Sequence, residues 1–190
     1  VKTTGGPPSG LPTAVRPLTF DDARALQRVP HTIAVAPTVW GNSEVAGNGR
    51  LRRTTVYGVS AAALQVFNMR VKTGQFLPDE EWESARGFVV LGSKLKDELF
   101  GAANPLGARV RIGTLQFRVI GVLKSKGDQG YFNPDDQVII PLTTAMKQVL
   151  GVDKLREIDI QVAKDGNVTT VQENTTVLLR KRHRLQSGVP

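Results

Sequence analysis

Apolar and polar residues alternate most regularly in the middle of the chain, between Asn104 and Leu123. Two alternating runs flank Gly113–Thr114, and a period of two predicts half-buried strands. Glycine at the first central position of the turn favours type II′, whose twist matches that of the flanking strands. The segment is therefore predicted to form a β-hairpin, with apolar positions at Val110, Ile112, Leu115, Phe117 and Val119.

Other short apolar runs predict further strands. A run that is apolar throughout, such as "FVVL" from residue 88, predicts a buried strand, whereas the alternation in "EIDIQVA" from residue 157 predicts a half-exposed strand. Pro37 suggests that its strand lies at an edge or carries a bulge, and residues 41–49 are expected to form a loop or hairpin tip. The predicted strands cover residues 31–40, 50–59, about 70–73, 88–92, 137–142 and 157–163.

Helices are predicted where apolar residues recur every three to four positions between capping signals. Thr19, with Asp22 three residues later, resembles a capping box, and Pro30 marks the end of that helix. Gly101 is expected to end another helix, and residues 77–87 are expected to be an exposed acidic connector. The remaining predicted helices cover residues 60–67, 93–101 and 143–151, and a last helix of about four turns has Val168, Val171, Thr175, Leu178 and Leu179 on one face.

The order of these elements predicts an α+β fold made of two lobes. The composition changes at Gly87, and the strand and helix at the end of the chain restore the character of its first part. The last elements are therefore expected to join the first lobe, with a mixed, mainly-β lobe inserted between its two halves. The predicted organisation is a flexible lead at residues 1–15, an outer lobe formed by residues 16–85 and 152–184, an inserted lobe at residues 86–151 and a tail at residues 185–190.

The chain of 190 residues carries a formal net charge of +8, which indicates either an anionic partner or a position near a membrane surface. Nucleic acid is not expected as a partner, because two Trp and two Tyr residues offer few rings for base stacking. The lack of cysteine excludes disulfides and thiolate zinc sites. No run of about 20 residues is apolar enough to span a membrane, and a first residue other than methionine suggests that the chain belongs to a longer protein.

The sequence offers few groups for catalysis. Of the two histidines, His31 is expected to cap or pack at a helix-to-strand junction, and His183 suits the negative end of a helix dipole. Motifs for a serine nucleophile or for phosphate binding are not found, so no catalytic, cofactor-binding or metal-binding residue is assigned. One alternative stays open, a metal-dependent hydrolase in which Asp128, Asp135 and Asp136 bind a hard cation through oxygen.

The polar loop over residues 124–136 contains the aromatic residues Tyr131 and Phe132. These are expected either to fold back over the hairpin or to form an exposed tip that contacts a partner, since aromatic residues are favoured binding anchors. The second interpretation assigns Tyr131, Phe132, Asp135 and Asp136 to partner binding. It also leaves open another function, that of a free-standing soluble binding module that uses this loop.

Several segments occur here in the same order as in one family of membrane transporters. They are "VVLGSKLKDELFGAANPLGARVRIGTLQFRVIGVLKSKG", "DDQVIIPLTTAMKQVLG", "IDIQVA" and "LLRKRH", and "PLTFDDARALQRVPHTIAVAP" and "VYGVSAAALQVFNMRVKTGQF" look like the opening half of the same family. The chain thus resembles, from about Leu18 to His183, the extracytoplasmic (periplasmic) core domain of MacB-type ABC transporter permeases. The shared motifs are structural rather than catalytic.

The resemblance implies a fold, a location and a role. The fold would be a small porter-like α/β lobe into which the mixed lobe is inserted. The domain would lie outside the bacterial cytoplasmic membrane, anchored by flanking transmembrane helices, and would couple ATP-driven motion of the membrane part to export or to a periplasmic partner. It would not be an enzyme and would need no cofactor, because ATP is used by the nucleotide-binding domain of the full transporter. The implied partners are a second permease copy and a membrane-fusion or other periplasmic protein.

Overall fold

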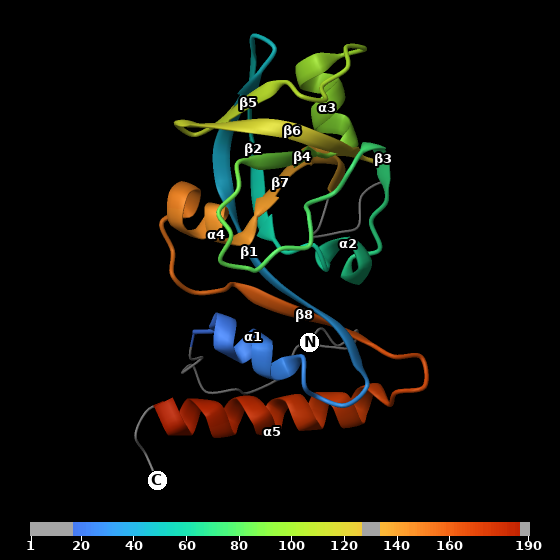
Figure 1. The fold of residues 1–190 in the computed structure, drawn as a ribbon, viewed down its shortest axis with the longest axis vertical. Helices are drawn as coiled ribbons and strands as arrows, with labels where there is room; N and C mark the ends of the chain where they lie inside the picture. Colours follow the sequence, from blue (N-terminus) through green and yellow to red (C-terminus); the bar gives the residue numbers. More distant parts are fainter. Residues whose placement is uncertain (1–16, 127–133, 187–190) are drawn as a thin grey trace. The chain divides into compact units, whose positions relative to one another are not determined.

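A computed structural model describes residues 17–126 and 134–186 of the chain (Figure 1). These residues form a mixed structure in which strands dominate, and this confirms the predicted α+β class. The helices are α1 (Phe20–Leu26), α2 (Ala63–Val66), α3 (Ser93–Phe100), α4 (Leu142–Thr144) and α5 (Val168–Gln186), with a 3-10 turn at Pro134–Asp136 and a π-helical turn at Ala145–Leu150. The strands are β1 (Thr32–Gly47), β2 (Arg50–Val59), β3 (Val71–Gly74), β4 (Phe88–Leu91), β5 (Arg109–Ile112), β6 (Leu115–Leu123), β7 (Gln137–Pro141) and β8 (Glu157–Val162).

Contacts within the chain divide the described residues into two compact units. One unit contains the residues up to Pro37 together with those from Lys154 onwards, and the other is Thr38–Asp153. On the N-terminal side the sequence predicts this boundary later in the chain, at residue 86. The difference arises from non-local strand pairs, because β2 pairs with β7 and β3 pairs with β6. The β1–β2 hairpin therefore shares a unit with the β5–β6 hairpin.

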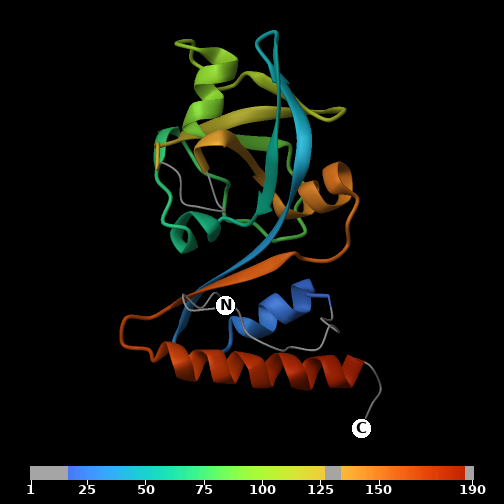
Figure 2. The ribbon, with the colours of Figure 1, turned by 180° about the vertical axis from the view of Figure 1, so that it is seen from behind.

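The strands of the unit Thr38–Asp153 close into a barrel (Figures 1 and 2). From β1, antiparallel pairing leads to β2, parallel pairing to β7, antiparallel pairing to β4, parallel pairing to β6 and antiparallel pairing to β5. Strand β5 then pairs back with β1, and β3 adds to β6 beside the ring. Closure removes most of the open strand edges of a sheet. The sequence predicts the individual strands but not their closure.

Residues that the alternating pattern predicts to be apolar fill the interior of this unit. Across the β5–β6 hairpin Val110 lies opposite Phe117, and Ile112 lies opposite Leu115. Of these four residues all but Leu115 are buried. Helix α2 belongs to a further apolar cluster, made of Tyr57, Val59, Ala63, Met69, Phe76, Leu77, Val90, Leu123 and Ile139.

The turn of the β5–β6 hairpin has the predicted form. Gly113 has a φ of +60°, whereas Thr114 is not among the residues with positive φ. A type II′ turn needs positive φ only at its first central position, while type I′ needs it at both. The predicted type II′ hairpin is therefore confirmed.

The β1–β2 hairpin is longer than the sequence indicates. A hairpin tip forms within the predicted segment 41–49, but it is much shorter than predicted, because β1 pairs with β2 at every position from Thr38 to Gly47. Only Asn48 and Gly49 form the turn, with φ values of +53° and +74°. Glycine, asparagine and serine are usual turn residues, but here the continuous pairing with β2 outweighs their local preference.

The predicted helix ends are largely confirmed. Helix α1 has the capping box, in which the hydroxyl of Thr19 accepts from the amide of Asp22 and the carboxylate of Asp22 accepts from the amide of Thr19. Helix α3 ends at Gly101, which has a φ of +58°. The helix predicted at residues 143–151 forms as α4 followed by the π-helical turn, and it ends at Gly151 in the left-handed conformation.

The other unit contains α1, β8, α5 and the beginning of β1. In both ribbon views α1 lies between β8 and α5 (Figures 1 and 2). Strand β8 pairs with β1, and the amide of Leu155 donates to the carbonyl of Leu18 over 2.9 Å. Helix α5 has 19 residues and is longer than predicted. Its buried face includes Val171 and Thr175, but Val168 is 54% exposed, so its assignment to that face is wrong.

The segment that follows β7 packs closely on the β1–β2 hairpin, and glycine makes this approach possible. A Cβ atom on Gly58 would lie 2.3 Å from the Cβ of Ala145 and 2.8 Å from Cγ2 of Val39. We therefore expect Gly58→Ala to lower the free energy of unfolding by about 1–3 kcal/mol through overpacking, as measured by urea denaturation. Gly87→Ala is the matched control, because its Cβ would meet nothing nearer than the carbonyl oxygen of Gln116 at 3.8 Å. Equal stability of the two variants would contradict the close packing.

Candidate functional site

The carboxylate of Asp135 is used within the fold. Its oxygens accept hydrogen bonds from Oγ of Ser125 at 2.9 Å and from the amide of Lys126 at 2.8 Å, and the residue is buried. Asp136 is half-buried, and its backbone carbonyl accepts from the hydroxyl of Thr54. These contacts fix the two ends of the predicted partner-binding loop. Tyr131, Phe132 and Asp128 lie outside the described residues, so their assigned roles stay predictions.

The structure assembles no metal centre in the parts of the chain that it describes. No three residues among His, Asp and Glu there come close enough together to hold an ion. Asp135, one of the three proposed ligands, directs both carboxylate oxygens to Ser125 and Lys126. The described geometry therefore gives the hydrolase alternative no support beyond the sequence pattern.

The acidic connector at residues 77–87 is largely exposed, as predicted; only Leu77 is buried, and Trp82 and Ser84 are half-buried. Two hydrogen bonds fix it to the segment that follows β7. The hydroxyl of Thr143 donates to the carbonyl of Trp82, and that of Thr144 donates to the carbonyl of Arg86 over 2.9 Å. Both threonines are buried. Thr143 and Thr144 are a polar pair that follows an apolar strand. Nothing in this local pattern predicts that their hydroxyls bind a segment about 60 residues away.

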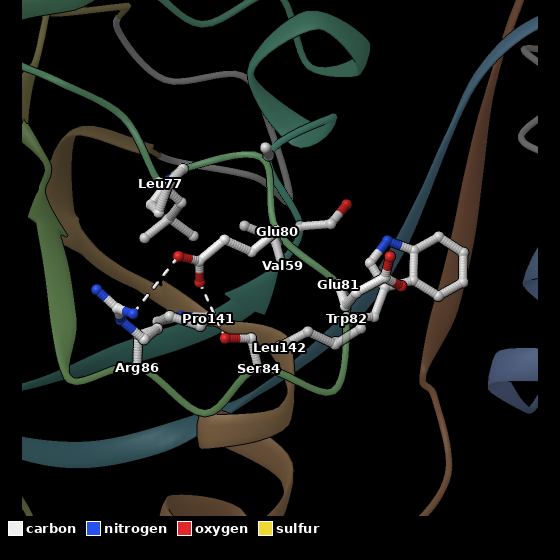
Figure 3. Close-up of a pocket in the computed structure, with 12 residues that line it drawn as sticks. Val59, Leu77, Glu80, Glu81, Trp82, Ser84, Arg86, Pro141 and Leu142 are labelled. Carbon is white, nitrogen blue, oxygen red and sulfur yellow. Dashed lines mark hydrogen bonds and ion pairs between the residues drawn. The ribbon is translucent and has the colours of Figure 1, made fainter.

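Charged side chains on this loop pair with each other. Oε2 of Glu80 accepts from the hydroxyl of Ser84 at 2.9 Å, and Oε1 of Glu80 lies 3.7 Å from the guanidinium of Arg86 (Figure 3). The guanidinium of Arg86 also lies over the ring of Phe88, 4.9 Å from its centroid. The hollow beneath the loop has room for about 20 Å³, which is enough for about one water molecule. It is therefore too small for an organic substrate.

A buried cluster of charges joins α1 to α5. Asp22 is completely buried. Its Oδ1 accepts from Nε of Arg182 at 3.0 Å, and its Oδ2 lies 3.2 Å from Nε2 of His183. The cluster of Asp22, Arg182 and His183 is called the α1–α5 clasp below. Sequence reasoning identified Asp22 as a capping residue but did not find these partners, which are 160 and 161 positions away.

The environment of Asp22 keeps its carboxylate charged. Burial alone raises the pKa of this group. The hydrogen bonds from Arg182, from the backbone of Thr19 and from His183 together outweigh burial and leave the pKa below the ordinary value of 3.8. His183 therefore contacts a buried carboxylate within its unit, in addition to its predicted position at the negative end of a helix dipole.

None of the helices within the described ranges combines the length and apolar character that a membrane crossing needs.

Comparison with known proteins identifies relatives along nearly the whole chain. The family model for the MacB-like periplasmic core domain matches residues 2–178. A macrolide export ATP-binding/permease protein MacB of Chlorobaculum tepidum is 33% identical over 182 residues, which are 95% of this chain and 28% of that protein. A MacB of Bdellovibrio bacteriovorus is 34% identical over 154 residues, 80% of this chain and 23% of the relative. The chain thus spans about a quarter of the length of these curated relatives.

Solved structures share the fold. The periplasmic region of MacB from Actinobacillus actinomycetemcomitans superposes with a TM-score of 0.79 at 24% identity, covering 90% of this chain and 76% of that one. The extracellular domain of the noncanonic ABC-type transporter YknZ from Gram-positive bacteria superposes with a TM-score of 0.76 at 20% identity, covering 88% and 84%. At these identities the likeness establishes the fold alone.

We expect the α1–α5 clasp to be a main source of stability for its unit. Asp22→Ala would leave Arg182 without its buried counter-charge and remove the helix cap, so the free energy of unfolding should fall by about 3 kcal/mol. Asp21→Ala is the control, because Asp21 is exposed and its 3.7 Å pair with Arg24 is a surface pair, for which a loss of under about 1 kcal/mol is typical. Urea denaturation followed by circular dichroism measures both, and similar losses would show that the clasp adds nothing.

The clasp also predicts a dependence of stability on pH. Because the folded-state pKa of Asp22 is below 3.8, the unfolded chain takes up the proton first as the pH falls. The stability that the charged carboxylate contributes is thus complete well above this value and is lost as the pH decreases through the folded-state pKa. Between about pH 5 and about pH 3 the wild type should lose more stability than Asp22→Asn. Parallel curves for the two proteins would contradict a lowered pKa.

Proposed function

Because the chain belongs to the family of MacB-like periplasmic core domains, we propose that it is the non-catalytic extracytoplasmic domain of an ABC transporter permease. The observation that carries this proposal is the family match over residues 2–178. The relatives' names describe them as ATP-binding and permease proteins for export, and this chain corresponds to about a quarter of their length. We therefore assign ATP hydrolysis and membrane anchoring to other parts of the full transporter.

The contacts of the candidate catalytic groups support a domain without chemistry of its own. His183 is directed to buried Asp22, and Asp135 to its own loop. The proposed domain needs no cofactor.

The helices α1 and α5, which belong to the same unit, support a role in transmitting motion. Helix α5 spans 19 residues, or about 28 Å at the usual rise. The α1–α5 clasp joins it to the first described helix through charge-assisted hydrogen bonds, which are stronger than neutral ones. If membrane helices flank this domain, a displacement of either one would reach α1 and α5 as one packed body, because packed elements shift as units.

The barrel supports the second part of the role, which is to present a surface. Its strands pair around a closed ring, and α3 is fixed to the β1–β2 hairpin by an ion pair of 3.3 Å between Arg52 and Glu98. We assign the unit with α1, β8 and α5 to the porter-like lobe and the barrel to the inserted lobe. The proposed partners are a second permease copy and a membrane-fusion or other periplasmic protein, to which the barrel would transmit ATP-driven motion.

A single cysteine tests location and coupling together, since the chain has none of its own. In the intact transporter, with cysteines elsewhere removed, Val177→Cys should react with a membrane-impermeant maleimide added outside spheroplasts, because Val177 is 64% exposed on α5. A nitroxide at the same position in proteoliposomes should change its spectrum when ATP and vanadate are added. Val171→Cys is the matched control on the same helix, because at 2% exposure it should react only after unfolding.

Labelling by maleimide tests the location, and the change in the nitroxide spectrum tests the coupling, so each can give a negative result without the other. Reaction of Cys at position 177 only from the cytoplasmic side would disprove the proposed location. Reaction from outside with a spectrum that ignores ATP would leave the location intact and disprove the coupling.

A further inference from the structure

The β5–β6 hairpin places two arginines directly opposite each other. Arg109 pairs with Arg118 in the strand register, and both side chains are exposed. Neither guanidinium forms an ion pair within the described ranges, and residues 104–123 contain no Asp or Glu. Like charges at opposite positions of a strand pair are destabilising. The fold therefore gains nothing from this arrangement.

Two other arginines of the barrel unit are neutralised locally. Arg52 lies 3.3 Å from the carboxylate of Glu98, and Arg86 lies 3.7 Å from that of Glu80. In contrast, Arg50 donates to the backbone carbonyl of Glu98. Arg50 and Arg109 therefore bring positive charge without a carboxylate partner, among the described residues, to the place where the β1–β2 hairpin meets β5.

Arg111 extends this charge toward β1. It lies opposite Ala46 in the register between β5 and β1. Its guanidinium donates to the carbonyl of Gly113 and forms no ion pair with the residues that the structure describes. A backbone carbonyl carries no net charge, so the guanidinium keeps its full positive charge.

A shallow hollow of about 370 Å³ lies between these arginines. Strand β5 pairs with β1 only through Arg111 and Ile112, so the two strands separate beyond this point. Leu51, which is 48% exposed, adds an apolar side chain to the rim. The residues that line the hollow are Ala46, Gly47, Gly49, Arg50, Leu51, Arg109, Arg111 and Gln116, none of them acidic or aromatic.

We propose that this surface, formed by Arg50, Arg109, Arg111 and Arg118 around Leu51 and called the basic hairpin surface, binds an extended acidic segment of a partner protein. Guanidinium groups bind carboxylates through paired hydrogen bonds. Leu51 on the rim can contact the side chain that lies between two acidic residues of the bound segment. A lining without aromatic rings offers no platform for nucleic-acid bases. The identity of the partner as a protein outside the cytoplasm rests on the proposed function, but the charge complementarity does not.

The test uses the 190-residue chain and a fluorescent decapeptide of alternating glutamate and threonine, with binding followed by anisotropy. The double variant Arg109→Glu/Arg118→Glu should bind at least about 10-fold more weakly than wild type. The double variant Arg28→Glu/Arg70→Glu changes the net charge equally at exposed arginines elsewhere and should stay within about 2-fold, since general attraction is screened by salt.

A neutral variant separates binding from folding. Arg109→Gln/Arg118→Gln removes the like-charge repulsion, so it should unfold at the same or a higher urea concentration than wild type while binding the peptide more weakly. A loss of binding that accompanies a loss of stability would overturn the assignment of these residues to recognition.

Three further outcomes would overturn the proposal. The first is that wild-type protein does not bind the acidic peptide. The second is that the two charge-reversal variants weaken binding equally. Binding to phosphatidylglycerol vesicles but not to the peptide, lost in Arg109→Glu/Arg118→Glu, would assign the surface to lipid instead. These measurements need no transporter, so their failure is distinct from failure of the labelling experiment at position 177.

Discussion

The long strand β1 is the constraint on which the rest of the barrel depends. It pairs with β2 along ten positions and, near its far end, with β5 through Val45 and Ala46. This second pairing is what turns a row of strands into a ring. Because β1 also pairs with β8, one strand supplies backbone hydrogen bonds to both units. The barrel lies between α1 and α5 in the sequence, and the backbone groups of β1 nevertheless find partners in β2, β5 and β8.

Local features of this fold can be predicted from the sequence, because their causes lie within a few residues. The capping box needs only Thr19 and Asp22, and the type II′ turn needs only glycine at position 113. The length of β1 is different. Residues 41–47 have the composition of a turn, and only ten consecutive pairs with β2 make them a strand. Similarly, closure of the ring depends on two pairs between residues more than 60 positions apart, which no periodicity encodes.

The functional features show the same division. The lack of catalytic motifs and the family resemblance can both be recognised from the amino-acid sequence alone. The clasp could not be predicted, because Asp22 and Arg182 are ordinary surface residue types that become partners only when α1 packs on α5. The basic hairpin surface is an intermediate case. Alternation puts Arg109 and Arg111 on one side of a strand, but the hollow beside them depends on where β1 and β5 separate.

The close packing of Gly41 has a consequence for the order in which the chain folds. A Cβ on this residue would lie 2.6 Å from Leu150, so the folded barrel holds its own first and last segments together. Helix α1 and helix α5 are separated by more than 140 residues of sequence. Once the barrel has formed, most of that loop is already closed, and the entropy of closing it no longer opposes their pairing. During synthesis α1 is made well before α5, so formation of the barrel between them shortens the loop that separates two helices distant in the sequence.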